Sequence, residues 1–329
     1  LKSMQSLLLF ISNMINVLNS KQSKELDELS INEKISLDNL IDNAGKSLST
    51  HIIEKISNPF NKTFLCISGT GNNGLDSIVC SYYLNKNNVK SDLLIVNPDI
   101  INSKYLKKYT SEFKYFNIDN LDDVHKYDWI VDGIFGTGLN RDMEGVYLKL
   151  SKKLKHHKNI LSVDVPSGVY TDTGKVANSY VRARETVTFA HPKICHFLGD
   201  GYANSGNLHT YSIGHIDNCN DDINIKLIEK SDINILIKSK DKNSNKYSGK
   251  KVISLCGSRK YTGALLLSNA SAMKAGAKIL RKITPSSLNQ ISFQHFESID
   301  ISIDDNDRGY LDLKQYDKAM KELSWSEIL

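Results

Sequence analysis

Two aspartates follow apolar stretches of the chain at points where a carboxylate could do chemistry. Asp164 ends the run Ile160 to Val163, and Pro166 fixes the turn after it. A carboxylate there can act as a general acid or base, or it can merely cap the end of the strand. Asp132 lies within or at the end of the apolar run Trp129 to Ile134, where an unpaired charge is costly. Asp132 therefore needs a cation or hydrogen-bond donors.

A glycine-rich segment follows another apolar run. Gly69, Gly71 and Gly74 have the spacing G-x-G-x-x-G, which occurs in dinucleotide-binding loops but is weak evidence alone. A dehydrogenase also needs an acidic residue about 20 positions further on, at the end of the next strand. Asp92 stands at the start of that strand instead, so the fingerprint of a dehydrogenase is incomplete.

Polar side chains accompany the glycines. Asn72, Asn73 and Asp76 lie in a predicted turn that would otherwise need only glycine, although all three can be mere turn formers. A second glycine loop, Gly136 to Gly138, follows Asp132 and could present successive N–H groups to a phosphate. Two such loops at adjacent strand ends are hard to explain as turns only.

Three of these side chains could also hold a cation. Asn73, Asp132 and Ser167 would supply hard oxygen ligands of the kind that suit alkali or alkaline-earth ions. The residues by themselves do not choose among these cations.

Composition excludes several classes of protein. The 329 residues carry a formal net charge of +5, with no basic run interleaved with aromatics, so we expect no nucleic-acid partner. The five cysteines are scattered, which indicates reduced thiols in a cytosol-like compartment. The run Leu7 to Ile11 is too short to span a bilayer, so we expect a cytoplasmic protein without a membrane span, while an address to a mitochondrion or another organelle stays open.

The elements that must position these residues alternate along the chain. Helix-forming segments separate the first four of six apolar β-rich runs, which predicts a mostly parallel sheet with helices on both faces. The runs are Thr63 to Ser68, Asp92 to Val96, Trp129 to Ile134, Ile160 to Val163, Thr186 to Ala190 and Leu208 to Ile213. We therefore expect an α/β fold, a Rossmann-like three-layer α/β/α sandwich, with ligands beyond the carboxyl ends of the strands.

Changes in composition divide the chain into four parts. Residues 1–30 form a predicted N-terminal extension and helix, and residues 31–216 form the main α/β domain. Residues 217–246 are rich in Asn, Asp, Lys and Ser, which is typical of a polar linker. A further strand and helix pattern occupies residues 247–329.

Five motifs, in this order and spacing, resemble the NAD(P)H-hydrate epimerase family: LIDNAGKS, GTGNNGLDS, VDGIFGTGL, VDVPSGVYTDTG and VTFAHPK. The resemblance runs from about Val17 to Gly214. The segment from Tyr247 to Ala277 is similar to the opening of the ADP- or ATP-dependent NAD(P)H-hydrate dehydratase domain, which has a ribokinase-like fold. The whole thus resembles a bifunctional nicotinamide nucleotide repair protein that is cut short.

The resemblance implies an isomerase that interconverts the R and S forms of hydrated NADH and NADPH (NADHX and NADPHX). It implies that Asp164 is catalytic and that Asn73, Asp132 and Ser167 coordinate one potassium ion. The substrate-binding residues that it implies are Asn72, Asn73, Gly74, Leu75, Asp76, Gly136, Thr137, Gly138, Leu139, Asn140, Arg141, Asp142 and Asp164, with Ala264 in the second block. Leu75 and Ser77 stand where the family usually has glycine. A homodimer is the candidate assembly.

The second block lacks the later glycine-rich loops of a dehydratase. We expect dehydratase activity, and a role for ATP or ADP, only in a full-length chain. Without the missing strands, Leu265 to Leu267 should lie on an uncovered apolar face.

Two alternative functions remain open, and three further residues have weaker evidence for a role in the site. An NAD-dependent dehydrogenase is one alternative, and a non-catalytic Rossmann-like binding module is the other. Lys193 either faces the phosphates of a dinucleotide or is a solvated lysine at a strand end. His191 and His196 flank it and read as hydrogen-bonding surface groups.

Overall fold

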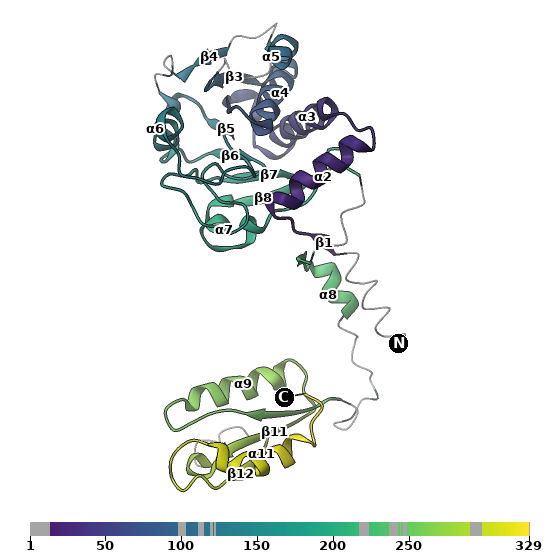
Figure 1. The fold of residues 1–329 in the computed structure, drawn as a ribbon, viewed down its shortest axis with the longest axis vertical. Coiled ribbons are helices and arrows are strands. Elements are labelled where there is room, and N and C mark those ends of the chain that lie inside the picture. Colours follow the sequence, from purple (N-terminus) through teal and green to yellow (C-terminus); the bar gives the residue numbers. More distant parts are fainter. Residues whose placement is uncertain are drawn as a thin grey trace. The chain divides into compact units, whose positions relative to one another are not determined.

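A computed structural model describes residues 14–97, 103–110, 115–118, 121, 123–216, 224–236, 243, 245, 249–289 and 298–328 (Figure 1). The chain forms two compact units, Leu1–Ile233 and Asn234–Leu329. Among the described residues, no helix combines the length and the apolar character that crossing a bilayer requires.

The first unit is built on a seven-stranded sheet with the order β4-β3-β2-β5-β6-β7-β8, in which every neighbouring pair is parallel. The strands are β2 (Thr63–Ser68), β3 (Lys90–Ile95), β4 (Tyr115–Asn117), β5 (Trp129–Gly133), β6 (Ile160–Val163), β7 (Glu185–Phe189) and β8 (Asn207–Tyr211). The predicted parallel α/β sheet is therefore confirmed. Strand order reverses between β2 and β5, and ligands of such sheets bind beyond this switch point.

Helices cover both faces of this sheet (Figure 1). Side chains alternate along β2, so that Phe64 and Cys66 join one apolar core and Leu65 and Ile67 join the other. The first core is completed by α3 (Leu37–Lys55), α4 (Asn72–Lys86) and α5 (Ser103–Thr110). The second is completed by α6 (Gly145–Leu154). These two cores make the three layers that the rhythm of the sequence predicts.

The chain before α3 is tied to a segment far along the sequence. Strand β1 (Ile15–Asn16) pairs antiparallel with β9 (Lys226–Leu227). Helix α2 (Ser20–Asn32) follows β1, and a capping box between Asn19 and Gln22 fixes its start. The predicted linker 217–246 is thus wrong for residues 226–236, which form β9 and α8 (Lys230–Leu236). Its polar composition hid the strand, because two paired residues leave almost no apolar pattern.

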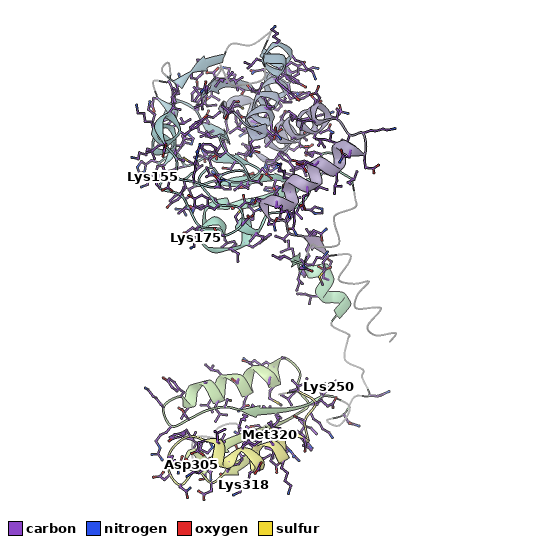
Figure 2. All side chains as sticks on the ribbon, in the orientation of Figure 1. Lys155, Lys175, Lys250, Asp305, Lys318 and Met320 are labelled. Carbon is purple, nitrogen blue, oxygen red and sulfur yellow. The ribbon has the colours of Figure 1, made fainter. Side chains whose placement is uncertain are left out.

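The second unit has a three-stranded parallel sheet, β10 (Lys251–Leu255), β11 (Ile279–Pro285) and β12 (Ile299–Ile303), with helices α9 (Thr262–Lys274) and α11 (Tyr316–Leu323). Asp305, labelled in Figure 2, accepts hydrogen bonds from Ser286 and Ser287 and pins the segment after β12. On α9, Leu267 is 71% exposed, as expected, but Leu265 is fully buried. Leu265 lies on the buried side of α9, next to Gly257, so the expectation of an uncovered face was wrong for this residue.

Candidate active site

Helix α4 begins at Asn72, so Asn72, Asn73 and Asp76 occupy the first turns of a helix rather than an open turn. Gly71 precedes it as the N-cap residue. A side chain at Gly74 would place its Cβ 2.1 Å from the carbonyl oxygen of Gly69, so the start of the helix packs directly on the loop. Neither Leu75 nor Ser77 has a positive φ, so glycine is not required at either position on conformational grounds.

The Asp132 carboxylate, at the end of β5, is fully buried and accepts four hydrogen bonds. They come from Ser162 Oγ (2.9 Å), Ser167 N (3.0 Å), Ser167 Oγ (2.6 Å) and Ile134 N (3.4 Å). All four donors are neutral. Burial raises the pKa of Asp132, and these hydrogen bonds offset only part of that effect. The site therefore favours either a proton on Asp132 or a cation beside it.

An oxygen-rich cluster surrounds Asp132. The Asn73 amide contacts the carbonyl oxygens of Val163 (2.6 Å) and Phe135 (3.4 Å), and Ser167 Oγ lies 3.3 Å from the same Phe135 oxygen. Asn73, Asp132 and Ser167 thus meet around one backbone carbonyl. A half-turn of the Asn73 amide exchanges its nitrogen for its oxygen, which would complete a set of oxygen donors. Such a set fits a hard cation.

Asp164 has an ammonium partner. Lys193 Nζ lies 2.5 Å from Asp164 Oδ1, and Thr188 Oγ1 donates to the same oxygen at 2.7 Å. Burial alone would raise the pKa of Asp164, but the charge and hydrogen bond of Lys193 lower it below its usual value. Asp164 also has a left-handed backbone (φ +62°), a conformation that functional sites often hold under strain.

Lys193 is 2% exposed, so the interpretation of it as a solvated lysine was wrong. His196 is buried as well and is not a surface group. Its Nδ1 accepts from Lys193 N (3.0 Å), and its Nε2 therefore carries the proton donated to Asp164 O (2.9 Å). Burial, followed by the charge of Lys193, lowers the pKa of His196 to about 4. The neutral imidazole thus links the backbone of Lys193 to the backbone of Asp164 through two hydrogen bonds. Burial likewise lowers the pKa of His191.

Asp76 lines the same cleft as Asp164, but its pKa is shifted in the opposite direction. Its side chain is 5% exposed, and burial, then the negative charges of Asp164 and Asp27, raise its pKa well above the usual value. The same cleft therefore raises the pKa of Asp76 and lowers the pKa of Asp164. Paired carboxyl groups whose surroundings separate their pKa values are typical of acid–base sites.

The cleft that Asp76 and Asp164 share has a volume of about 630 Å³ including its open mouth. Helix α2 forms one wall, where Asp27 lies 2.7 Å from His215 Nε2. The buried Nδ1 of His215 has no hydrogen-bond partner among the described residues. Sequence reasoning missed both residues: Asp27 lies on α2, away from any predicted strand, and His215 follows the predicted run Leu208 to Ile213 without a motif that marks it.

The predicted substrate-binding residues separate into groups. Asn72, Asn73, Asp76, Thr137 and Asp164 line the cleft. Leu139, Arg141 and Asp142 line a second hollow beside Phe135 and Tyr147. Gly74 and Leu75 are buried in α4, and Gly136 packs against the Asn73 amide. Gly138 and Asn140 are exposed in the loop after β5. Ala264 lies on α9 of the second unit.

The first unit matches known proteins. The family model described as YjeF-related protein N-terminus covers residues 37–195. The chain is 33% identical to the NAD(P)H-hydrate epimerase of Weissella koreensis over 157 residues, which are 46% of this chain and 70% of that protein. It is 32% identical to the NAD(P)H-hydrate epimerase of Oenococcus oeni over 188 residues, which are 54% of this chain and 86% of that one.

A longer relative and a solved structure extend the comparison. The bifunctional NAD(P)H-hydrate repair enzyme of Thermofilum pendens is 31% identical over 261 residues, 76% of this chain. Because the match covers only 49% of that enzyme, the chain spans about half the length of this kind of relative. The crystal structure of yeast ynu0 superposes with a TM-score of 0.49 at 20% identity, over 65% of this chain and 100% of the yeast chain.

Proposed function

Since the chain belongs to the NAD(P)H-hydrate epimerase family, we propose that its first unit interconverts the R and S forms of NADHX and NADPHX. The observation that carries this proposal is the pair of buried carboxyl groups that line one cleft, Asp164 paired with Lys193 and Asp76 with its pKa raised by burial. Epimerisation at a hydroxyl-bearing carbon needs an acid and a negative charge at the same place, as the following steps explain.

The proposed reaction begins with loss of the hydroxyl group. Asp76 gives its proton to the departing hydroxyl, which leaves as water and takes the bonding electron pair with it. The nitrogen of the ring shares the resulting positive charge. Ionised Asp164, held by Lys193, stabilises that charge in a cleft that is partly closed to water.

Re-addition of water completes the reaction. Water attacks the other face of the ring carbon, and the Asp76 carboxylate takes up the released proton. Each group then returns to its initial state, and the substrate has changed only its configuration. In this scheme the proton moves at Asp76, whereas Asp164 acts through its charge, a revision of the expectation that Asp164 itself transfers the proton.

Asn73, Asp132 and Ser167 would hold one potassium ion. A bound monovalent cation supplies positive charge that balances Asp132 and fixes the adjoining loops. The Asn73 amide would then position the start of α4, and with it Asp76, because both residues lie on the same helix. A homodimer and a cytoplasmic location remain predictions.

The test is chromatography of NADHX during incubation with the purified chain. A sample enriched in the S form should approach the equilibrium mixture of R and S much faster than without protein. Lys175→Ala, a change at an exposed lysine, is the matched control and should keep the rate. An unchanged S fraction in the presence of well-folded protein would refute the proposed activity.

A further inference from the structure

A second group of potential metal ligands lies toward the amino-terminal ends of β7 and β8, away from the strand ends that line the cleft. Glu185 begins β7, whereas Phe189, at the other end of that strand, lines the cleft. His51 comes from the last turns of α3, and His209 comes from β8 beside Glu185. Three separate elements therefore contribute one side chain each, away from the proposed active site.

The three side chains converge on one carboxylate oxygen. His51 Nε2 lies 2.6 Å from Glu185 Oε2, and His209 Nε2 lies 3.8 Å from the same atom. The potential ligand atoms all lie within 4.8 Å of one another, and the two imidazole rings have centroids 4.5 Å apart. His51 Nε2 is within hydrogen-bond distance of this oxygen, whereas His209 Nε2 lies beyond it, so two imidazole nitrogens face one carboxylate oxygen from different distances.

Two histidine nitrogens and a glutamate oxygen are a known ligand set for zinc, with a fourth position left for water. Tetrahedral coordination with bond lengths near 2 Å places the ligand atoms roughly 3.3 Å apart, so the 2.6 Å contact between His51 and Glu185 has to lengthen and His209 has to come closer to Glu185. His209 is 34% exposed and can make this adjustment, while His51 is fully buried and held in place.

The surroundings support metal binding rather than oppose it. Tyr211 Oη lies 3.0 Å from His51 Nδ1, the kind of contact that orients the ring of a metal-bound histidine from behind. Glu54 adds negative charge near Tyr211, and Lys55 adds positive charge near His209.

We propose that His51, Glu185 and His209 form a zinc-binding site, with water as the fourth ligand. The ion joins the last turns of α3 to the first residue of β7 and the middle of β8. The other end of α3 carries Leu37, Leu40 and Ile41, which line the cleft. Zinc at this site therefore stabilises the helix that forms one wall of the proposed active site, without touching the substrate.

Zinc titration of the full chain, freed of metal with a chelator, tests the proposal. One equivalent of Zn²⁺ should bind, and the melting temperature should rise by roughly 5 °C when free zinc is a hundred times its dissociation constant. Co²⁺ in place of Zn²⁺ should give the visible absorption of a four- or five-coordinate ion.

His209→Gln removes the least buried ligand and should abolish both signals while the chain stays folded. Glu185→Gln should weaken binding strongly, because it removes the only charged ligand. His125→Gln is the matched control, since His125 stacks on His157 in another histidine pair and should leave zinc binding intact. Zinc binding that persists in His209→Gln, or absence of stoichiometric zinc in the wild type, would overturn the site. Neither result depends on epimerase activity.

Discussion

Asp132 and Asp164 are both buried aspartates at the carboxyl ends of neighbouring strands, yet their surroundings shift their pKa values in opposite directions. Neutral hydroxyl and amide donors surround Asp132, and its pKa is raised by burial. Asp164 has the ammonium group of Lys193, and its pKa is lowered. The comparison teaches that burial alone does not decide whether a strand-end carboxylate is ionised. The nature of the donors decides it, and that determines which chemistry each aspartate can do.

The largest expected effect concerns a third aspartate, Asp76, which is the proposed acid. Asp76→Asn removes the acid and keeps the shape of the side chain, so the epimerisation rate should fall by about a hundred-fold or more. Asp164→Asn should also slow the reaction, through loss of charge. Chromatography of NADHX measures both rates. A near-normal rate in Asp76→Asn would show that Asp76 is not the acid and would leave Asp164 as the candidate for proton transfer.

The same variant gives a pH test. The raised pKa of Asp76 means that the folded state prefers the protonated form, so its contribution to stability is complete below the pKa of the unfolded chain. That contribution is lost as pH rises through the raised pKa. Thermal unfolding measured from below the usual pKa of aspartate upward should show the wild type losing stability relative to Asp76→Asn as pH increases. Parallel curves for the two proteins would mean that Asp76 is ionised in the fold.

Removing the ammonium should convert Asp164 into a destabilising buried charge. Lys193→Met should lower the free energy of unfolding by about 3 kcal/mol or more at neutral pH, because the carboxylate loses its only charged partner among the described residues. Adding Asp164→Asn to this variant should restore part of the loss. Denaturant unfolding of the two single variants and the double variant measures the coupling. Additive losses would show that the pair is not coupled.

Asp132 should respond to potassium rather than to lysine. Wild-type protein should melt at a higher temperature in potassium chloride than in the chloride of a bulky organic cation, because the ion binds only the folded state. Asp132→Asn should lose this difference, whereas Lys193→Met should keep it. Equal melting temperatures of the wild type in the two salts would contradict the cation site.

The smallest effects come from a matched pair of hydroxyl deletions. Ser162→Ala removes one donor from Asp132, and Thr188→Val removes one from Asp164. Each should cost about 1 kcal/mol of stability, and Thr188→Val should cost more because it also removes the acceptor of Lys193 Nζ. Denaturant midpoints of the two variants decide the order. A larger loss in Ser162→Ala would contradict this ranking.

Much of the fold could be predicted from the sequence, because six strands of the main sheet are apolar runs long enough to stand out. Strand β4 could not, since three residues of edge strand carry no readable alternation. Asp132 and Asp164 could be selected because strand ends mark the ligand-binding edge of a parallel sheet. The partnership of Lys193 with Asp164 could not, since 29 residues separate them and the sequence gives no sign of which lysine is buried.

The pairing of β1 with β9 sets a condition on synthesis of the protein. Ile15 is among the first described residues to leave the ribosome, but its partner Leu227 follows more than two hundred residues later. Helix α2, which follows β1, supplies Ser23, Leu26 and Asp27 to the cleft. Helix α2 can already be held by the contacts of Ser20 with Asp172 and of Asp27 with His215 before β9 is made. A nascent chain whose residue 216, but not residue 226, has left the ribosome should therefore display the folded sheet with β1 still unpaired.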